Sequence, residues 1–96
     1  MVVFMAKDKA DSAHIRQRNR QSHVERLKKF HKEGLIAFAG PLKDDSDENM
    51  IGSLILFQTN SPDLVREIMD EDPYTRAGLF DSVTIHRVDK VLTTPL

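Results

Sequence analysis

The sequence lacks cysteine and tryptophan, and it contains no long apolar run. Without cysteine the chain can form no disulfide, no thiolate nucleophile and no cysteine-ligated metal site. No apolar stretch approaches the roughly 20 residues that a membrane-spanning helix needs. We therefore expect a protein without a membrane segment, and the missing disulfides fit a cytoplasmic location.

An excess of charge of one sign is also missing, because the formal net charge is −1. The basic residues concentrate in the first third of the chain, which could in principle bind phosphate groups. A nucleic-acid-binding domain, however, usually carries a strongly basic surface and aromatic side chains that stack on bases. Aromatic residues make up only 6% of this chain. We therefore expect no nucleic-acid partner.

The size and composition predict one globular domain. Two halves of a 96-residue chain would each be too small to hold a core without disulfides or metals. The apolar content of 40% and the charged content of 30% are ordinary for a globular protein. We predict a single domain over residues 1–96.

The stretch from Ile15 to Glu33 predicts a long helix with an unusual inner face. Spacings of three and four residues bring side chains back to the same side of a helix. The residues on this face are Arg16, Arg20, His23, Leu27 and Phe30, with Val24 at its edge. Its C-terminal half is apolar and should dock on a core, so its N-terminal half carries two guanidinium groups and an imidazole to the same interior or to a cleft. The residues expected on the solvated faces are Glu25, Arg26, Lys28, Lys29 and Lys32.

Four strands and a second helix complete the predicted elements. The strands are expected at Val2–Ala6, Leu35–Leu42, Gly52–Gln58 and Ser82–Val91. Gly34 follows the first helix where a left-handed residue commonly ends one. The second helix begins at Ser61 with Pro62 in its first position, and Pro73 ends it. Its apolar stripe extends to Asp72, which should therefore point inward, while Tyr74 follows in a turn.

The order strand–helix–strand–strand–helix–strand predicts an α+β fold, the ferredoxin-like βαββαβ sandwich. Two helices can cover only one face of a four-stranded sheet. Leu54 and Leu56 alternate with Ile55 and Phe57, so both faces of the third strand are apolar. An exposed apolar sheet face indicates an interaction surface, and two-fold pairing is the commonest closure. We therefore expect a homodimer.

We expect neither a metal nor a cofactor. The acidic segment 43–49 lacks the spacing, the central glycine and the final glutamate of a calcium-binding EF-hand, so it is read as a solvated hairpin loop. His14, His31 and His86 lack a ligand partner three or four residues away, so each is read as a surface histidine. No glycine-rich loop precedes a helix.

Several short motifs, taken together, resemble the YciI-like (YCII-related) family of small dimeric α/β-barrel proteins. The resemblance covers nearly the whole chain. The motifs are Ala6-Lys7-Asp8, Arg16, Arg20-x-x-His23, Gly34, Gly40-Pro41, Gly52-Ser53 and Asp72-Pro73-Tyr74-x-x-Ala77-Gly78. The chain departs from the family in its compact acidic loop, its additional histidines and a tail beyond Val91, none of which affects His23 or Asp72.

The resemblance implies a ferredoxin-like protomer that dimerises through its sheets. It also implies a pocket in which a histidine and an aspartate form a catalytic dyad, here His23 and Asp72. One branch of the family is similar to enzymes that remove chloride from chlorinated hydroxyquinols, and the wider superfamily includes muconolactone isomerases. By analogy, the resemblance implies cofactor-free proton transfer or elimination on a small ring or lactone.

The chemistry of the residues agrees with this interpretation. A carboxylate on one imidazole nitrogen fixes the tautomer and raises the basicity of the other nitrogen. Arg16 and Arg20 could bind a substrate carboxylate or stabilise a developing oxyanion, and Tyr74 could donate to the same oxygen. The alternatives are a binding or interaction dimer in which the same pocket only holds a small anion, and a buried ion-pair network without a function of its own.

Overall fold

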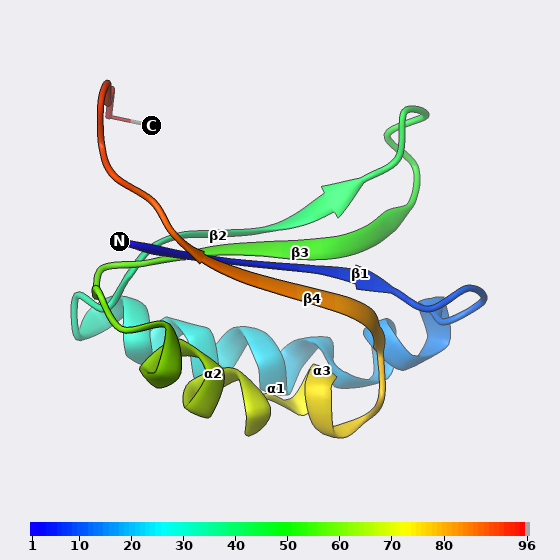
Figure 1. Cartoon of the computed structure of the whole chain (residues 1–96). Helices are drawn as coiled ribbons and strands as arrows, with labels where there is room; N and C mark the ends of the chain where they lie inside the picture. The colour runs from blue at the N-terminus through cyan, green and yellow to red at the C-terminus, as the bar shows by residue number, and fades with distance from the viewer. Residues whose placement is uncertain (96) are drawn as a thin grey trace.

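The computed structural model describes residues 1–95 and has one antiparallel sheet with helices packed on one face (Figure 1). The strand order is β2-β3-β1-β4. The elements are β1 (Val2–Asp8), α1 (Ala13–Lys32), β2 (Ile36–Lys43), β3 (Met50–Phe57), α2 (Pro62–Asp70), α3 (Pro73–Arg76) and β4 (Phe80–Arg87). The predicted α+β, ferredoxin-like arrangement is therefore confirmed.

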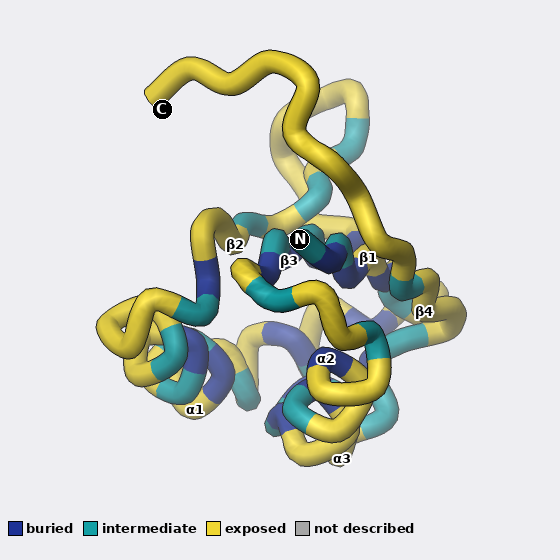
Figure 2. Tube along the Cα trace, turned by 60° about the vertical axis from the view of Figure 1, so that its left-hand side comes forward, coloured by how far each residue is buried: buried dark blue, intermediate teal, exposed yellow. Residues whose placement is uncertain are grey.

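The core lies between the sheet and the two longer helices. Alternate residues of β1 and β3 face the helices, and Figure 2 shows the buried stretches gathered where the two layers meet. This packing follows from the period of two in a strand, which directs every second side chain to the same face. The buried cluster comprises Val2, Phe4, Ala6, Leu27, Ile36, Ile55, Phe57, Val65 and Met69.

Two of the predicted helix-end signals, Gly34 and Ser61, are present in the structure. Gly34 has a φ of 83° directly after α1, the left-handed conformation that glycine adopts without strain. At the start of α2, the Ser61 hydroxyl accepts a hydrogen bond from the Leu64 amide at 3.1 Å. Ser12 occupies the N-cap position of α1 but does not cap it with its side chain, because its hydroxyl donates to the carbonyl of Lys9 at 2.6 Å.

The segment after α2 differs from the prediction. The sequence predicted one helix ending at Pro73 and then a turn, but α2 ends at Asp70 and a new short helix begins at Pro73. Proline at a first helical position and aspartate before it are favourable N-terminal signals, which explains the restart. The fourth strand was predicted at Ser82–Val91; it is present, but it begins and ends earlier, since β4 spans Phe80–Arg87.

The second face of the sheet carries no helix among residues 1–95 (Figures 1 and 2). Val3 pairs with Leu56 and Met5 pairs with Leu54, out of phase with the buried residues of the same strands. Phe38 pairs with Leu56 and is 43% exposed. The apolar second face that the sequence predicted is therefore present.

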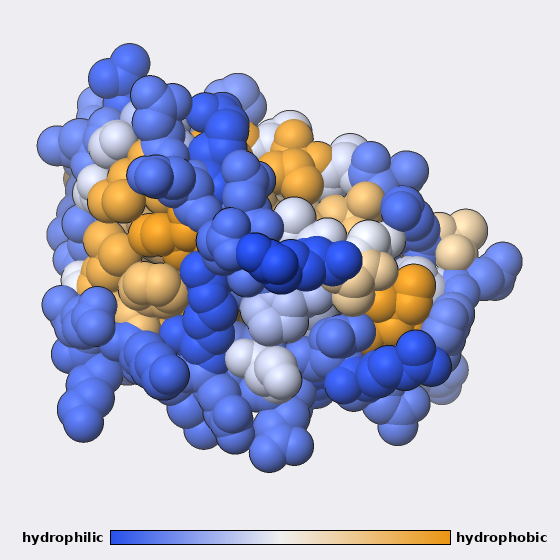
Figure 3. Space-filling model, turned by 90° about the horizontal axis from the view of Figure 1, so that it is seen from below, coloured by the Kyte–Doolittle hydropathy of each residue, from blue (hydrophilic) through white to orange (hydrophobic). Residues whose placement is uncertain are grey.

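Within residues 1–95, no helix has both the length and the apolar composition to cross a membrane. Viewed from the helix side, the molecule is mostly hydrophilic, and apolar side chains reach the surface in patches between the polar ones (Figure 3).

Candidate functional site

The centre of the site is a hydrogen bond between two residues that lie 49 positions apart. Nδ1 of His23, on α1, is 2.7 Å from Oδ2 of Asp72. The Asp72 side chain is completely buried, and the backbone amide of Tyr74 also donates to the same carboxylate oxygen at 3.0 Å. Asp72 precedes α3, so the restart of the helix fixes the direction of its carboxylate. Both residues of this pair belong to the same chain.

This contact determines the chemistry that His23 can perform. The carboxylate oxygen that faces Nδ1 also accepts a hydrogen bond from the Tyr74 amide, so it acts as the acceptor. The neutral ring then carries its proton on Nδ1 and leaves Nε2 as an acceptor. His23 lines a cleft, so Nε2 is the ring nitrogen available to a bound molecule. That arrangement suits a general base.

Tyr74 packs directly against the histidine. The two rings stack with their centroids 3.8 Å apart and their planes 18° from parallel. Tyr74 is 1% exposed. Burial raises the pKa of its phenol, and the nearby charges of Arg16 and Arg20 oppose that rise. The phenol therefore stays protonated near neutral pH, as a hydrogen-bond donor must.

Arg16 is held by protein groups on several sides. Its Nε donates to Oδ2 of Asp8 at 2.7 Å, and its Nη2 donates to Oδ1 of the same carboxylate at 3.0 Å. The same Nη2 reaches the Gly52 carbonyl at 2.9 Å and the Ser53 hydroxyl at 3.0 Å. Its guanidinium carbon lies 4.8 Å from the centre of the Tyr74 ring. Arg16 therefore joins α1 to β1 and β3.

Glycine at position 52 makes this junction possible. A Cβ built on Gly52 would collide with the backbone carbonyl oxygen of Ala6 on the neighbouring strand. The close approach of β1 and β3 here presents the Gly52 carbonyl to Arg16. Gly52 is thus explained by packing rather than by binding of a phosphate.

Arg26 places a positive charge beside Asp72, although the sequence predicted a solvated position for it. Its Nη1 is 3.5 Å from Oδ1 of Asp72, too long for a hydrogen bond. Both of these atoms are buried, and neither finds a hydrogen-bond partner among residues 1–95. Arg26 therefore adds positive charge on the side of Asp72 away from the oxygen that His23 binds.

Arg20 differs from both of these arginines. It is exposed and lines the cleft with His23. No hydrogen bond or ion pair joins its side chain to another group in the part of the chain that the structure describes. Its guanidinium is therefore free to bind an anion beside His23.

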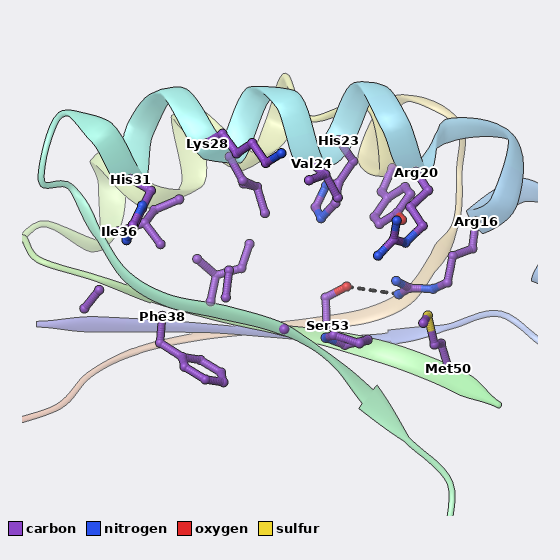
Figure 4. A pocket seen from close by; sticks show the side chains of 17 residues that line it. Arg16, Arg20, His23, Val24, Lys28, His31, Ile36, Phe38, Met50 and Ser53 are labelled. Atoms are coloured by element: carbon purple, nitrogen blue, oxygen red, sulfur yellow. Dashed lines mark hydrogen bonds between the residues drawn. The ribbon is translucent and has the colours of Figure 1, made fainter. Parts of the chain in front are cut away.

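The cleft lies between α1 and the strands β2 and β3 and has a volume of about 390 Å³. Arg16, Arg20 and His23 extend from α1 toward the strands, with His31 at the opposite end of the row (Figure 4). β2 is an edge strand, so the space beneath α1 opens to solvent on that side. The lining residues are Arg16, Arg20, His23, Val24, Leu27, Lys28, His31, Ile36, Ala37, Phe38, Ala39, Gly40, Pro41, Met50, Ser53, Ile55 and Tyr74.

All five residues predicted from the sequence gather here. Arg16, Arg20, His23 and Tyr74 line the cleft, and Asp72 lies behind His23. The roles predicted for them in catalysis and substrate binding stay predictions. The structure leaves Arg16 less able to bind a substrate than the sequence predicted, because its Nε and Nη2 already donate to protein groups.

Sequence reasoning missed other members of the site. Lys28 and His31 were predicted to be surface residues, and both are exposed, but the prediction did not show that they also line the cleft. Asp8 was not identified as the partner of Arg16, although it ends a strand eight residues before it. The alternation of β3 could have indicated Ser53, because it shares a face with the buried Ile55 and Phe57.

The acidic loop is organised by its own hydrogen bonds. The side chains of Ser46 and Asn49 donate to the Asp44 carboxylate at 2.7 Å each, and together with backbone amides they lower the Asp44 pKa to about 2. Across residues 1–95 there is no cluster of three or more His, Cys, Asp or Glu side chains placed to hold a metal ion.

The chain is similar to known proteins over nearly its whole length. The YCII-related domain matches residues 1–89. Protein YciI of Escherichia coli O6:H1 (strain CFT073) is 32% identical to this chain, over 95% of it and 98% of the relative. A protein of Haemophilus influenzae described as uncharacterized is 29% identical, over 93% and 96% of the two chains.

A solved structure is similar in both sequence and fold. It is the 5-chloro-2-hydroxyhydroquinone dehydrochlorinase of Burkholderia phenoliruptrix AC1100, in complex with 2,5-dihydroxybenzoquinone. Its TM-score with this chain is 0.79 at 28% identity, and the match covers 93% of this chain and 94% of that chain. From the domain match and the E. coli relative, we conclude that this chain belongs to the YCII-related domain family.

Proposed function

We propose that this protein is a cofactor-independent lyase or isomerase that acts on a small anionic ring or lactone compound in the cleft. The observation that carries the proposal is the bond between Nδ1 of His23 and the buried Asp72 carboxylate. A histidine oriented in this way can remove a proton, and Arg20, which has no side-chain partner among residues 1–95, can hold the resulting anion.

Each residue has a role in the proposed step. Nε2 of His23 takes a proton from an acidic C–H or O–H bond, and Asp72 stabilises the imidazolium that forms. The electron pair of the broken bond moves into the ring as a new double bond, and Arg20 binds the negative charge. In an elimination, a leaving group such as chloride departs with the electron pair of its own bond. In an isomerisation, His23 returns the proton to another carbon.

Tyr74 and Arg16 support this step in different ways. Tyr74 is stacked on the imidazole and keeps its phenolic proton, so it can both fix the ring and donate to a substrate oxygen. Arg16 adds positive potential, while its bonds to Asp8 and β3 hold the wall of the cleft in place.

The dehydrochlorinase supports the elimination form of this reaction. That protein acts on a chlorinated hydroxyhydroquinone and was solved with 2,5-dihydroxybenzoquinone. Both compounds are single rings with acidic hydroxyl groups, which an arginine and a general base can recognise together. We therefore take chlorinated hydroxyquinols as the first substrates to test and 2,5-dihydroxybenzoquinone as the first ligand.

We also propose that the chain forms a homodimer through the second face of its sheet. The support is the row of paired apolar residues on that face, Val3, Met5, Leu54 and Leu56, which lies opposite the helices. A stable dimer should bury more than about 1,200 Å² in total. Light scattering should therefore give twice the chain mass of 11.0 kDa at micromolar concentrations, and a monomer would refute this part of the proposal.

The test of the function is turnover of chlorinated hydroxyquinols and muconolactones by wild-type protein and by His23→Ala. General base catalysis is typically worth about 10²–10⁴-fold, so kcat should fall by that factor. His14→Ala is the matched control, because His14 is exposed and lies outside the cleft. Turnover that survives His23→Ala would refute the mechanism. Binding of 2,5-dihydroxybenzoquinone without turnover of any compound would favour a binding protein instead.

A further inference from the structure

The carboxylate of Asp72 has a basic side chain of α1 beside each of its two oxygens. Oδ2 lies 2.7 Å from Nδ1 of His23, and Oδ1 lies 3.5 Å from Nη1 of Arg26. His23 and Arg26 are three residues apart on α1, so they are neighbours on the helix surface. The proposed reaction uses only the His23 side of this carboxylate, and Arg26 has no part in it.

Arg26 is held close to Asp72 in a largely buried position. The side chain of Arg26 is 24% exposed, and that of Asp72 is completely buried. Nη1 and Oδ1 are themselves buried and have no hydrogen-bond partner among residues 1–95. The guanidinium also lies over the Phe30 ring, with its central carbon 5.1 Å from the ring centre. Salt and water therefore screen the charge of Arg26 much less than they screen a surface charge.

Other charged or titratable groups also face His23, but none of them offsets Asp72 in the same way. They are Arg16, Arg20 and Lys28 of α1 and the phenol of Tyr74. Arg16 is paired with Asp8, and the phenol is uncharged near neutral pH. Arg20 and Lys28 are exposed to solvent, and Lys28 is directed along α1 toward His23 (Figure 4). The strand residues that line the cleft are uncharged.

The charge of Asp72 alone would work against a general base. A carboxylate in contact with an imidazole favours the charged ring. In the charged ring both nitrogens carry a proton, so Nε2 cannot accept another one. A positive charge on the far side of the carboxylate opposes this effect, because it offsets the negative potential at the ring. With Arg26 in place, Asp72 can orient a neutral His23 through Nδ1 and leave Nε2 as an acceptor.

We infer that Arg26 is a positioning residue for His23, which offsets the charge of Asp72 and so keeps the imidazole in its neutral form. The inference rests on the proposed function only for the use of the neutral ring as a base, because the effect of Arg26 on the ring needs no substrate. It extends the site to a residue that does not line the cleft.

Nitrogen-15 NMR of the histidine side chains tests the inference, because the ring shifts show which nitrogens carry a proton. The signals of His23 are those lost in His23→Ala, and circular dichroism verifies that each variant is folded. At pH 7, Arg26→Met should raise the ratio of charged to neutral His23 ring about tenfold, the lower end of what a neighbouring charge contributes. Methionine has about the helix propensity of arginine but no charge. If Arg26→Met does not fold, Arg26→Gln replaces it with the same expected rise.

Two control variants and a change of salt separate this effect from a structural one. Arg26→Lys keeps the positive charge and should keep the ratio close to that of wild type. Lys29→Met removes an exposed basic charge one turn further along α1 and should leave the ratio unchanged. The rise in Arg26→Met should persist in about 1 M salt, because Arg26 is largely buried against Asp72.

Four results would overturn the inference: a ratio in Arg26→Met no higher than in wild type, an equal rise in Arg26→Lys, an equal rise in Lys29→Met, or a rise that salt abolishes. The proposed chemistry fails separately. If chlorinated hydroxyquinols turn over but Arg26→Met leaves the ring unchanged, the inference fails and the proposed function stands. If the ratio rises as expected but no compound turns over, the effect of Arg26 on His23 stands and the proposed chemistry fails.

Discussion

Basic side chains line both ends of the cleft, but they differ in burial and in hydrogen bonding. At the N-terminal end, Arg16 is buried and donates four hydrogen bonds to Asp8, Gly52 and Ser53. On the C-terminal half of α1, Lys28 and His31 are exposed and have no such partners among residues 1–95. Arg20 lies one turn from Arg16, yet it resembles the C-terminal pair in being unpaired.

The charge of Arg16 stabilises the fold, whereas the charges without protein partners among residues 1–95 are available to a ligand. A buried charge without a partner costs several kcal/mol, so Arg16 can be buried only because Asp8 pairs with it. An exposed cation at the mouth of a cleft avoids that cost and can exchange water for an anion. The helix periodicity places Arg16 and Arg20 on the same face, and their burial and their partners distinguish them.

Replacing Arg16 and Arg20 in turn should affect the stability of the protein very differently. Arg16→Leu leaves the carboxylate of Asp8 buried and unpaired, so it should lower the free energy of unfolding by about 3–5 kcal/mol. Arg20→Leu removes an exposed charge without a partner and should change it by less than about 0.5 kcal/mol. Leucine and arginine have similar helix propensities, which makes the pair a matched comparison.

Urea denaturation of the two variants measures this difference directly. Equal losses of stability in Arg16→Leu and Arg20→Leu would show that the ion pair of Arg16 does not hold the N-terminal end of the cleft. A loss in Arg20→Leu alone would reverse the assignment of the two arginines.

A smaller effect concerns the phenol at the N-terminal end. Burial raises the pKa of Tyr74 above the ordinary value of 10.0. The folded protein therefore retains the phenolic proton at a pH where the unfolded chain releases it. The stability that this supplies is fully present below about pH 10 and is lost as the pH rises through the folded-state pKa.

Tyr74 is the only tyrosine, and the chain has no tryptophan, so ultraviolet titration of the phenolate reports on this residue alone. The midpoint should lie above 10.0 in the folded protein and return to about that value in denaturant. Tyr74→Phe should also lose less stability than wild type between pH 10 and the folded midpoint. A folded midpoint at or below 10.0 would contradict the burial that the structure describes.

Much of the fold could be predicted because its signals are local. Gly34 ends α1, Pro62 begins α2, and the alternation in Met50–Phe57 gives a strand with a buried face. The short helix α3 was missed because one proline both ends a helix and begins another. Which of these applies at Pro73 depends on the preceding Asp72, whose carboxylate binds the Tyr74 amide.

The periodicity of α1 predicted the part of the site that this helix carries. It brought Arg16, Arg20 and His23 to the inner face, and the pattern after Met69 directed Asp72 inward. It could not show that β2 would be an edge strand, which opens the cleft beside Lys28 and His31. Nor could it reveal that Asp8 pairs with Arg16, since that contact depends on how β1 and α1 pack.

Calorimetric titration with 2,5-dihydroxybenzoquinone tests the claim that Arg20, which has no side-chain partner among residues 1–95, binds a small anion beside His23. Wild type should bind it, and Arg20→Gln should weaken binding about tenfold, the typical value of a charged hydrogen bond. Arg18→Gln, an exposed arginine of α1 outside the cleft, should leave the affinity unchanged. Equal affinities for wild type and Arg20→Gln would contradict the claim.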